Sequence, residues 1–473
     1  MEFLADLSVL YQKHTGAPAQ QTVELQAHGS ERRIFRLHGA ATTAIGIYNA
    51  DRAENLAFLA FSRHFRGCQL PVPEIYREDL ERSVYLEEDL GDETLFAILN
   101  QERQQSGFSA RVLDLYRKIM HVLPRFQIQA GKNLDYTLCY PRGRFDRQSM
   151  MWDLNYFKYY FLKLAKIPFN EQTLEDDFVT FVDFLLEADQ NYFLYRDFQS
   201  RNIMIRAEQP WFIDYQGGRR GALQYDVASL LFDAKADIPF EVREELLRLY
   251  LDVANELAPV ARAKFLKYYY GYVVIRILQA MGAYGFRGFY ERKTHFLQSV
   301  PYAIRNLEYV LRLAEFPVPM PALTDVLHRL VRSSALRELG DVQLALTVRL
   351  QSFSFKNGLP KDETGHGGGF VFDCRALPNP GRLPQFAQLT GNDEEVIRYL
   401  ENETSVHHFM THVRDLIDQV VEGYRKRNFT DLSVAFGCTG GQHRSVYCAN
   451  MLAKHVREKY QVHVELRHGG LEK

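Results

Sequence analysis

The chain has 473 residues, of which 46% are hydrophobic and 25% are charged, and its 57 Lys and Arg nearly balance its 59 Asp and Glu. This composition is ordinary for a globular protein with a large buried core, and at about 150 residues per domain the length favours two to four domains. It argues against a strongly basic nucleic-acid binder and against a disordered scaffold, which would hold fewer apolar and aromatic residues.

The cysteines and the start of the chain bear on location. The five cysteines are odd in number and form no C-x-x-C pair, which favours a reducing compartment over a disulfide framework or a zinc knuckle. The start, MEFLADLSVLYQKH, lacks the basic residues and cleavage site of a signal peptide. No apolar run approaches the roughly 18 residues that a membrane span needs. We therefore expect a cytoplasmic protein without a membrane segment.

The first ninety residues predict a small sheet with one helix. Residues 20–47 favour strands with breaks near two glycines, and adjacent pairing would make a meander. Apolar residues at helical spacing predict a helix over 51–66, with Asp51 as its N-cap. Residues 73–90 favour a hairpin. From residue 109 to 313 the pattern is mainly helical, with short strands and loops around 192–216.

The segment around residues 316–322 has prolines at alternate positions, which favours an extended linker that cannot continue a helix. An α/β pattern follows it. Its predicted elements are a strand at 344–355, a helix at 406–424, a strand at 432–437, a helix at 445–460 and a strand at 463–466.

The densest chemistry of the N-terminal part lies in residues 193–218. Asp197 and Asn202 occupy a loop after an apolar strand, and a second short strand delivers Asp214 twelve residues after Asn202. Pairing of the two strands flanking this gap would bring Asn202 and Asp214 side by side. In phosphoryl transfer, these two could hold Mg²⁺ on the phosphates of ATP while Asp197 orients a substrate hydroxyl and accepts its proton. The alternative is a hairpin that carries surface carboxylates.

These motifs resemble the aminoglycoside/choline phosphotransferase family of protein-kinase-like enzymes. Y-R-D-F-Q-S-R-N resembles the family's catalytic loop, and F-I-D-Y-Q-G its metal-binding segment. The resemblance covers roughly residues 10–315 and implies two lobes with ATP in the cleft between them. It also implies that Asp226 braces the catalytic loop, although a helix N-cap is an alternative interpretation.

Within that family, the chain is most similar to bacterial anomeric kinases of N-acetylmuramate and N-acetylglucosamine. The similarity rests on residues 29–36, 84–91, 145–147 and Asp153-Leu154. It implies a turn over the phosphates, a hinge that presents backbone groups to adenine, and sugar contacts that could equally be surface ion pairs. The residues concerned are Gly29, Ser30, Arg32, Arg33 and Glu88 for ATP, and Asp146, Arg147 and Asp153 for the sugar.

One departure concerns the strand lysine that holds the α- and β-phosphates in protein kinases. Residues 42–50 contain no lysine, and none lies between Lys13 and Lys118. Either the kinase is inactive, or an arginine such as Arg32, Arg33 or Arg36 supplies the charge.

A second constellation follows the predicted strand at 432–437. A glycine-containing turn between a strand and a helix exposes backbone N–H groups at the positive end of the helix dipole, which makes an anion site to which Arg444 and His443 add side-chain donors. The alternatives are a tight turn with an incidental arginine, or the C-x₅-R loop of cysteine-dependent phosphatases. The residues of this turn are Cys438, Thr439, Gly440, Gly441, Gln442, His443, Arg444 and Ser445.

Residues 342–473 resemble the RapZ C-terminal domain family, most specifically in G-C-T-G-G-Q-H-R-S-V-Y and P-N-P. The resemblance implies a glucosamine 6-phosphate site, with RNA as a further ligand in some relatives. Gly381 stands where relatives carry a histidine, and the basic tail is reduced to Leu471-Glu472-Lys473. Residues 323–473 hold 19 Lys and Arg against 18 Asp and Glu, so they lack the positive excess on which RNA-backbone binding relies.

Together these features predict an α+β protein-kinase-like two-lobed domain at 1–315, followed by a smaller α/β domain at 323–473. The lobes divide near residue 90, and the linker spans 316–322. We expect an ATP- and Mg²⁺-dependent kinase of a small-molecule sugar, fused to a phosphosugar-binding domain. The alternative is a non-catalytic nucleotide and metabolite sensor that binds RNA or a protein partner.

Overall fold

Two compact units divide the chain, Met1–Val331 and Arg332–Lys473. The computed structural model describes residues 2–25, 32–40, 42–339, 346–360, 369–426, 429, 431–460 and 462–471.

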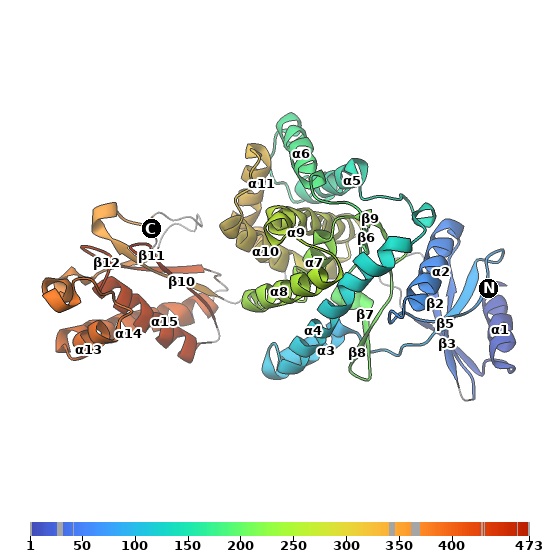
Figure 1. The fold of residues 1–473 in the computed structure, drawn as a ribbon, viewed down its shortest axis with the longest axis horizontal. Helices are drawn as coiled ribbons and strands as arrows, with labels where there is room; N and C mark the ends of the chain where they lie inside the picture. Colours follow the sequence, from blue (N-terminus) through green and yellow to red (C-terminus); the bar gives the residue numbers. More distant parts are fainter. Residues whose placement is uncertain are drawn as a thin grey trace. The chain divides into compact units, whose positions relative to one another are not determined.

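The first unit begins with an antiparallel five-stranded sheet of strand order β1-β2-β3-β5-β4, which confirms the predicted meander and hairpin. Helices α1 and α2 lie on opposite sides of this sheet (Figure 1). Leu7 and Tyr11 of α1 pack on Phe35 and Leu86 of the sheet in one buried cluster. Sequence reasoning missed α1. The elements are α1 (Glu2–Thr15), β1 (Gln21–Leu25), β2 (Arg33–His38), β3 (Thr43–Tyr48), α2 (Arg52–Gly67), β4 (Ile75–Asp79) and β5 (Val84–Glu88).

Helix α2 starts where the sequence predicts. The side chain of Asp51 accepts hydrogen bonds from the N–H groups of Ala53 (3.0 Å) and Glu54 (3.1 Å), which satisfies two free donors of the first turn. On its buried face, the Phe58 ring stacks between Tyr85 of β5 and Tyr215, with centroids 5.5 and 5.0 Å away. Helix α2 therefore joins the sheet to the residues that follow Asp214.

The second lobe of this unit is mainly helical, as predicted, with two small antiparallel sheets, β6–β9 and β7–β8. Its helices are α3 (Leu95–Ser106), α4 (Ala110–Pro124), α5 (Arg147–Phe157), α6 (Glu171–Leu186), α7 (Gln224–Leu231), α8 (Phe240–Leu257), α9 (Arg262–Gly285), α10 (Val300–Leu313) and α11 (Pro321–Arg332). Its strands are β6 (Tyr192–Leu194), β7 (Ile203–Arg206), β8 (Gln209–Phe212) and β9 (Arg219–Gly221).

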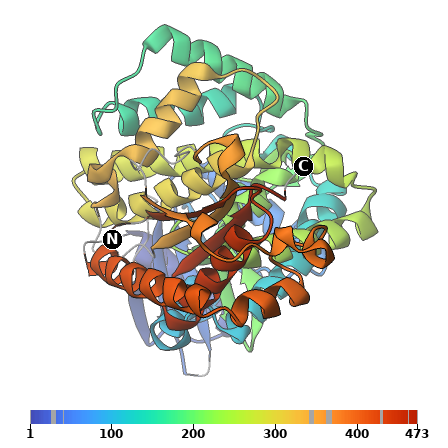
Figure 2. The same ribbon diagram turned by 90° about the vertical axis from the view of Figure 1, so that its left-hand side faces the viewer.

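The second unit is a four-stranded parallel sheet of order β11-β12-β10-β13. Helix α15 packs on this sheet, and α14 lies beyond it on the same side (Figures 1 and 2). The predicted strands and helices are present, and β11, α12 and α13 are additional. The elements are α12 (Ser334–Arg337), β10 (Thr347–Ser354), β11 (Gly369–Asp373), α13 (Glu394–Glu401), α14 (Thr404–Lys426), β12 (Asp431–Cys438), α15 (Arg444–Lys459) and β13 (His463–His468).

The predicted fold class, a two-lobed α+β domain followed by a smaller α/β domain, is therefore confirmed. Within the described ranges, no helix is long and apolar enough to cross a bilayer.

The boundary between the units lies later than the sequence places the second domain. Helix α11 begins at Pro321, and its Leu323 N–H donates a 2.8 Å hydrogen bond to the buried carboxylate of Asp177 in α6. Its apolar face is also buried, through Leu327 and Leu330 among others. Since these contacts attach α11 to the helical lobe, the first unit continues through Val331.

Two truncated chains test this attachment. A chain of residues 1–332 retains α11, whereas residues 1–320 leave Asp177 and the surface under α11 exposed. Each buried leucine or valine of α11 contributes about 1.5–3 kcal/mol, so we expect the shorter chain to unfold at a clearly lower temperature. Equal melting temperatures by circular dichroism would show that α11 adds nothing to the first unit.

Candidate functional site

The β7–β8 hairpin brings the two predicted metal ligands together. Ile203 pairs with Phe212, so Asn202 just before β7 faces Asp214 just after β8. Asn202 Nδ2 donates to Asp214 Oδ2 (2.8 Å) and to the main-chain oxygen of Asp197 (2.9 Å). One amide thus links the predicted base to the predicted metal carboxylate.

Asp226 holds the loop that carries Asp197. Its carboxylate accepts hydrogen bonds from the backbone N–H groups of Tyr195 (2.8 Å) and Arg196 (3.1 Å), and from Gln127 Nε2 (2.9 Å). Burial raises the pKa of Asp226 to about 7, although these three donors favour the carboxylate. The bracing role implied by the family resemblance fits this geometry. The N-cap interpretation is wrong, because Leu223 occupies the N-cap of α7.

The backbone is strained at two positions of the site. Arg196 and Asp214 have φ values of +84° and +70°, in the left-handed region that residues with a Cβ rarely adopt. The guanidinium of Arg196 makes two 2.7 Å hydrogen bonds to Asp153. The Tyr195 hydroxyl donates to the Ile213 carbonyl (2.7 Å), so Tyr195 ties the loop to the residue before Asp214.

Asp214 lies in an environment that suits a divalent cation. Burial, and then the nearby Asp197, raise the pKa of Asp214 to about 6, whereas the amide of Gln216 (2.6 Å) lowers it. Gln216 Oε1 is buried without a hydrogen-bond partner in the part of the chain that the structure describes. Mg²⁺ prefers oxygen ligands and would relieve the repulsion between the two carboxylates. The donor set of Asp214 and Asn202 therefore fits this ion.

Among the three arginines that the sequence offers, Arg32 interacts electrostatically with this carboxylate. Its guanidinium pairs with Glu54 of α2 at 2.8 Å, with 9% of the Arg32 side chain exposed, and it attracts Asp214 electrostatically. Arg33 instead pairs with Glu24 on the surface, and Arg36 with Asp89 and Asp92. Arg32 thus supplies a cation between α2 and Asp214, although β3 has no lysine.

The remaining residues predicted to contact ATP are Gly29, Ser30 and Glu88. Gly29 and Ser30 lie outside the described residues. Glu88 uses its N–H to donate to the Glu74 carbonyl (2.8 Å), and its carboxylate pairs with Arg206 of the helical lobe (2.7 Å). Glu87 lies in the predicted hinge. Burial raises the pKa of its carboxyl to about 8, and its Oε2 is buried without a partner in the described part of the chain.

All three predicted sugar contacts already have protein partners. Asp153 pairs with Arg196. Asp146 is the N-cap of α5 and also pairs with Arg142, and Arg147 pairs with Asp183 where both side chains are half exposed. This arrangement favours the alternative interpretation, in which these side chains form ion pairs.

In the second unit, the predicted anion loop begins where two parallel strands end together. Ser354 of β10 is aligned with Cys438 of β12, and its hydroxyl donates to the Thr439 carbonyl (2.8 Å). Gly441 has φ +69°, and a Cβ there would lie 2.9 Å from the Ser354 nitrogen. Glycine is therefore required at 441 on both grounds.

The long side chains of this loop bind the protein itself. Gln442 donates to the Leu389 carbonyl (2.6 Å), and His443 Nε2 donates to the Phe386 carbonyl (2.9 Å). Arg444 Nη1 donates to the Arg375 and Leu377 carbonyls at 2.9 and 3.0 Å. His443 Nε2 and Arg444 Nη1, which we expected to add side-chain donors to the anion site, therefore fix the loop. Arg444 Nε is buried without a hydrogen-bond partner in the part of the chain that the structure describes. Thr439 and Gly440 are exposed.

The pKa of the Cys438 thiol shows how strongly hydrogen-bond donors inside this loop stabilise a negative charge. Burial alone would raise its pKa, but hydrogen bonds from the Ser445 hydroxyl (3.1 Å) and the N–H groups of Ser445 and Gly441 hold the pKa below its ordinary value. Donors that stabilise a thiolate also favour the oxygens of an anion at the start of α15.

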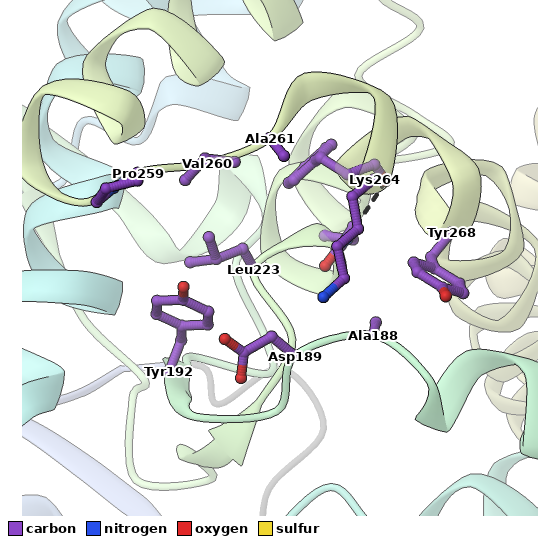
Figure 3. A pocket seen from close by; sticks show the side chains of 11 residues that line it. Ala188, Asp189, Tyr192, Leu223, Pro259, Val260, Ala261, Lys264 and Tyr268 are labelled. Atoms are coloured by element: carbon purple, nitrogen blue, oxygen red, sulfur yellow. Dashed lines mark hydrogen bonds between the residues drawn. The ribbon is translucent and has the colours of Figure 1, made fainter.

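A separate cavity of about 240 Å³ lies behind the catalytic loop, between the residues that follow α6 and those that precede α9 (Figure 3). Asp189 and Lys264 point into it from opposite walls, with Leu223 between them (Figure 3). None of the predicted catalytic or metal residues lines it, so it is distinct from the candidate active site.

Comparison with known proteins decides the family. The model of the phosphotransferase enzyme family matches residues 21–263, more than half of the chain, which include Asp197, Asn202, Asp214 and Asp226. The chain belongs to the phosphotransferase enzyme family. The RapZ C-terminal domain matches residues 346–470, so this phosphotransferase carries a RapZ-type second domain.

Curated relatives match over a limited length. The RNase adapter protein RapZ of Yersinia pseudotuberculosis serotype O:1b is 40% identical over 146 residues, which are 31% of this chain and 49% of that protein. A nucleotide-binding protein of Actinobacillus pleuropneumoniae serotype 5b is 40% identical over 134 residues, 28% of this chain and 45% of that protein. The chain thus spans about half the length of these relatives.

Solved structures give weak similarity. A choline/ethanolamine kinase family protein of Mesorhizobium loti has a TM-score of 0.45 and 13% identity, over 71% of this chain and 99% of that one. Choline kinase of Cryptosporidium parvum has a TM-score of 0.43 and 11% identity, over 65% and 93%. The fold class of this phosphotransferase rests instead on its own topology and on the family match.

Replacement of Asp226 tests the bracing of the catalytic loop. In Asp226→Ala, two buried backbone N–H groups lose their acceptor, at about 1–3 kcal/mol each. We expect the free energy of unfolding, measured in urea, to fall by about 3 kcal/mol. The exposed Asp252→Ala is the control. A loss no larger than that of the control would contradict the bracing role.

The raised pKa of Asp214 predicts a pH-dependent metal affinity. Below about pH 6 the protonated carboxyl predominates in the metal-free protein, and a proton must leave before Mg²⁺ binds. The affinity for Mg²⁺-ADP should therefore weaken between pH 7.5 and 5, by up to about tenfold per pH unit below 6. In Asp214→Asn this dependence should disappear. Calorimetry at several pH values measures both, and a flat profile for the unaltered protein would refute the assignment.

Proposed function

We propose that this protein is an ATP-dependent kinase that phosphorylates a hydroxyl of an amino sugar, the anomeric hydroxyl first among the candidates, and that it acts in the cytoplasm. The observation that supports this most is the cluster of Asp197, Asn202 and Asp214 in a chain of the phosphotransferase family. The choice of an amino sugar rests on the similarity to anomeric sugar kinases and on the RapZ-type second domain.

In this proposal Asp197 performs the proton transfer. It follows the strained Arg196 on a loop held by Asp226, so the carboxylate keeps one position without help from the substrate. It orients the attacking hydroxyl and accepts its proton as the new O–P bond forms. The neighbouring Arg196 is paired with Asp153 and so cannot form an ion pair with Asp197 and block it.

Phosphate charge is the second requirement of the reaction. Asp214 and Asn202 would hold Mg²⁺, which when bound neutralises charge on the transferred and leaving phosphates. Arg32 would contact the nucleotide phosphates from its position just before β2, and Glu54 keeps it in place. An arginine stays protonated at all relevant pH values, and its planar fork suits phosphate oxygens.

The second domain would bind a phosphorylated amino sugar at residues 438–445 and regulate the kinase. Backbone N–H groups at the start of α15, Thr439 and the shaped turn at Gly441 support an anion site there. RapZ relatives are named RNase adapters, but the balanced charge of residues 323–473 favours a small ligand over RNA.

A screen of amino sugars tests the kinase. The purified protein is incubated with ATP and Mg²⁺, and ADP release is measured with each sugar. We expect sugar-dependent release that Asp197→Ala lowers by at least about 10³-fold while nucleotide affinity is kept. Nucleotide binding without turnover of any sugar would favour the alternative, a non-catalytic sensor.

A glycine pair tests the regulatory site. In Gly441→Ala the new Cβ meets the Ser354 nitrogen, so calorimetry should show at least about tenfold weaker binding of glucosamine 6-phosphate. Gly423 in α14 has open space around its Cβ position, and Gly423→Ala should bind normally. Equal affinity in both variants would remove the loop from the proposed site.

A further inference from the structure

Arg219 stands beside the catalytic loop, where no sequence motif marks it. It is the first residue of β9 and pairs with Leu194, the last residue of β6. Because the chain runs from Leu194 directly to Asp197, Arg219 starts next to the loop that carries the predicted base. Attraction between Arg219 and Asp197 shows that the two charges lie within electrostatic range.

The guanidinium of Arg219 is buried without a carboxylate in direct contact, among the residues that the structure describes. Only 7% of the residue is exposed. Its Nε donates to the Gly217 carbonyl (2.9 Å) and its Nη2 to the Tyr140 carbonyl (3.4 Å), both neutral acceptors. Over the ranges that the structure describes, Arg219 forms no ion pair with a carboxylate at 4.0 Å or less. Burial, and then the neighbouring Arg196 cation, lower its pKa.

Arg196, next to Asp197 in this loop, has a different set of hydrogen-bond partners from Arg219. Both guanidinium groups are buried, but Arg196 makes two 2.7 Å bonds to the carboxylate of Asp153. A buried cation is favourable only when an anion and hydrogen bonds replace its water. Arg196 has that compensation in direct contact, whereas Arg219 has two carbonyl dipoles and the longer-range attraction of Asp153 and Asp197. Arg219 is therefore a buried charge beside the catalytic loop without a directly bound anion among the described residues.

The backbone links this charge to the residue next to Asp197. A Cβ built on Gly217 would lie 3.8 Å from Asp197 Oδ2 and 3.6 Å from Arg196 Cγ. The carbonyl of this same glycine holds Arg219 Nε. The wall next to the Asp197 carboxylate thus consists of Gly217, with Arg219 attached to it.

We propose that Arg219 binds anionic oxygens of a reactant beside Asp197, a role that rests on the proposed kinase function. Two sources share this chemistry: the phosphoryl group during its transfer, and an acidic substituent of the acceptor sugar. In either case Arg219 disfavours a cationic acceptor, because a positive group would meet an uncompensated guanidinium in a poorly solvated site.

Binding measurements on the full-length chain test this without requiring turnover. The first probe is Mg²⁺-ADP with and without aluminium fluoride, which imitates the transferring phosphoryl group. The second is a pair of sugars, N-acetylglucosamine and N-acetylmuramic acid, which differ by one carboxylate-bearing ether. Calorimetry compares the unaltered protein, Arg219→Gln, Arg219→Lys and the control Arg220→Gln, whose guanidinium lies over the Tyr136 ring.

Two quantities are compared: the gain in Mg²⁺-ADP affinity on adding aluminium fluoride, and the ratio of the affinities for N-acetylmuramic acid and N-acetylglucosamine. We expect Arg219→Gln to bind Mg²⁺-ADP alone within twofold of the unaltered protein but to lose at least tenfold in one of these two quantities. Loss of the first identifies the phosphoryl group as the ligand of Arg219, and loss of the second identifies the acceptor sugar. Arg219→Lys keeps the charge without the fork and should lose less, and it serves if the glutamine variant does not fold. The control Arg220→Gln should keep both quantities.

The proposal is overturned if Arg219→Gln retains both quantities within twofold, or if the unaltered protein shows neither. If the proposed kinase function is wrong but Arg219 does bind anions, the measurements give a different pattern. Arg219-dependent binding of the fluoride complex or of the acidic sugar, without turnover of any sugar, would leave the anion site in place and remove the proposed reaction.

Discussion

The candidate active site depends on one buried carboxylate, that of Asp226. Two consecutive N–H groups of the catalytic loop end on it, and Gln127 joins it to Tyr250 of α8 through a 2.6 Å hydrogen bond. A buried acceptor with three donors is expensive to disrupt, since each donor would be left without a partner. This is what allows Arg196 to keep a strained backbone and Asp197 to be placed before a substrate arrives.

The second constraint is the concentration of negative charge at the same place. Asp197 and Asp214 repel each other, and burial adds to the penalty, so the site is arranged for cations that bind with the nucleotide. Protein kinases meet part of this need with a lysine on the third strand. Here a cation comes from Arg32, just before β2, and α2 holds it through Glu54. The position of the charge, rather than the residue that carries it, is what the chemistry requires.

Much of this could be predicted from the sequence, because the relevant signals are local. The spacing of Asn202 and Asp214 around two short strands fixed their contact, and Asp51 marked the start of α2. The elements of the parallel sheet followed from their apolar runs. Helix α1 was missed, since fourteen residues at a chain end carry little beyond their periodicity.

Other features depend on distant contacts that no local pattern reveals. The sequence offered three arginines for the phosphates, and only the packing of α2 selects Arg32. The sequence offered His443 and Arg444 as anion donors, but carbonyls of residues 375–386 occupy His443 Nε2 and Arg444 Nη1. The prolines before α11 suggested a boundary, yet the hydrogen bond of Leu323 to Asp177 attaches that helix to the first unit.

The central claim is that this lobe, whose strand β3 has no lysine, binds nucleotide phosphates through Arg32. Calorimetric affinity for Mg²⁺-ATP tests this claim most directly. Arg32→Ala should weaken binding at least about tenfold, as expected for loss of a charge-assisted phosphate contact. Arg32→Lys should give an intermediate value, and the exposed Arg77→Ala should bind normally. An affinity of Arg32→Ala within twofold of the unaltered protein would contradict the account.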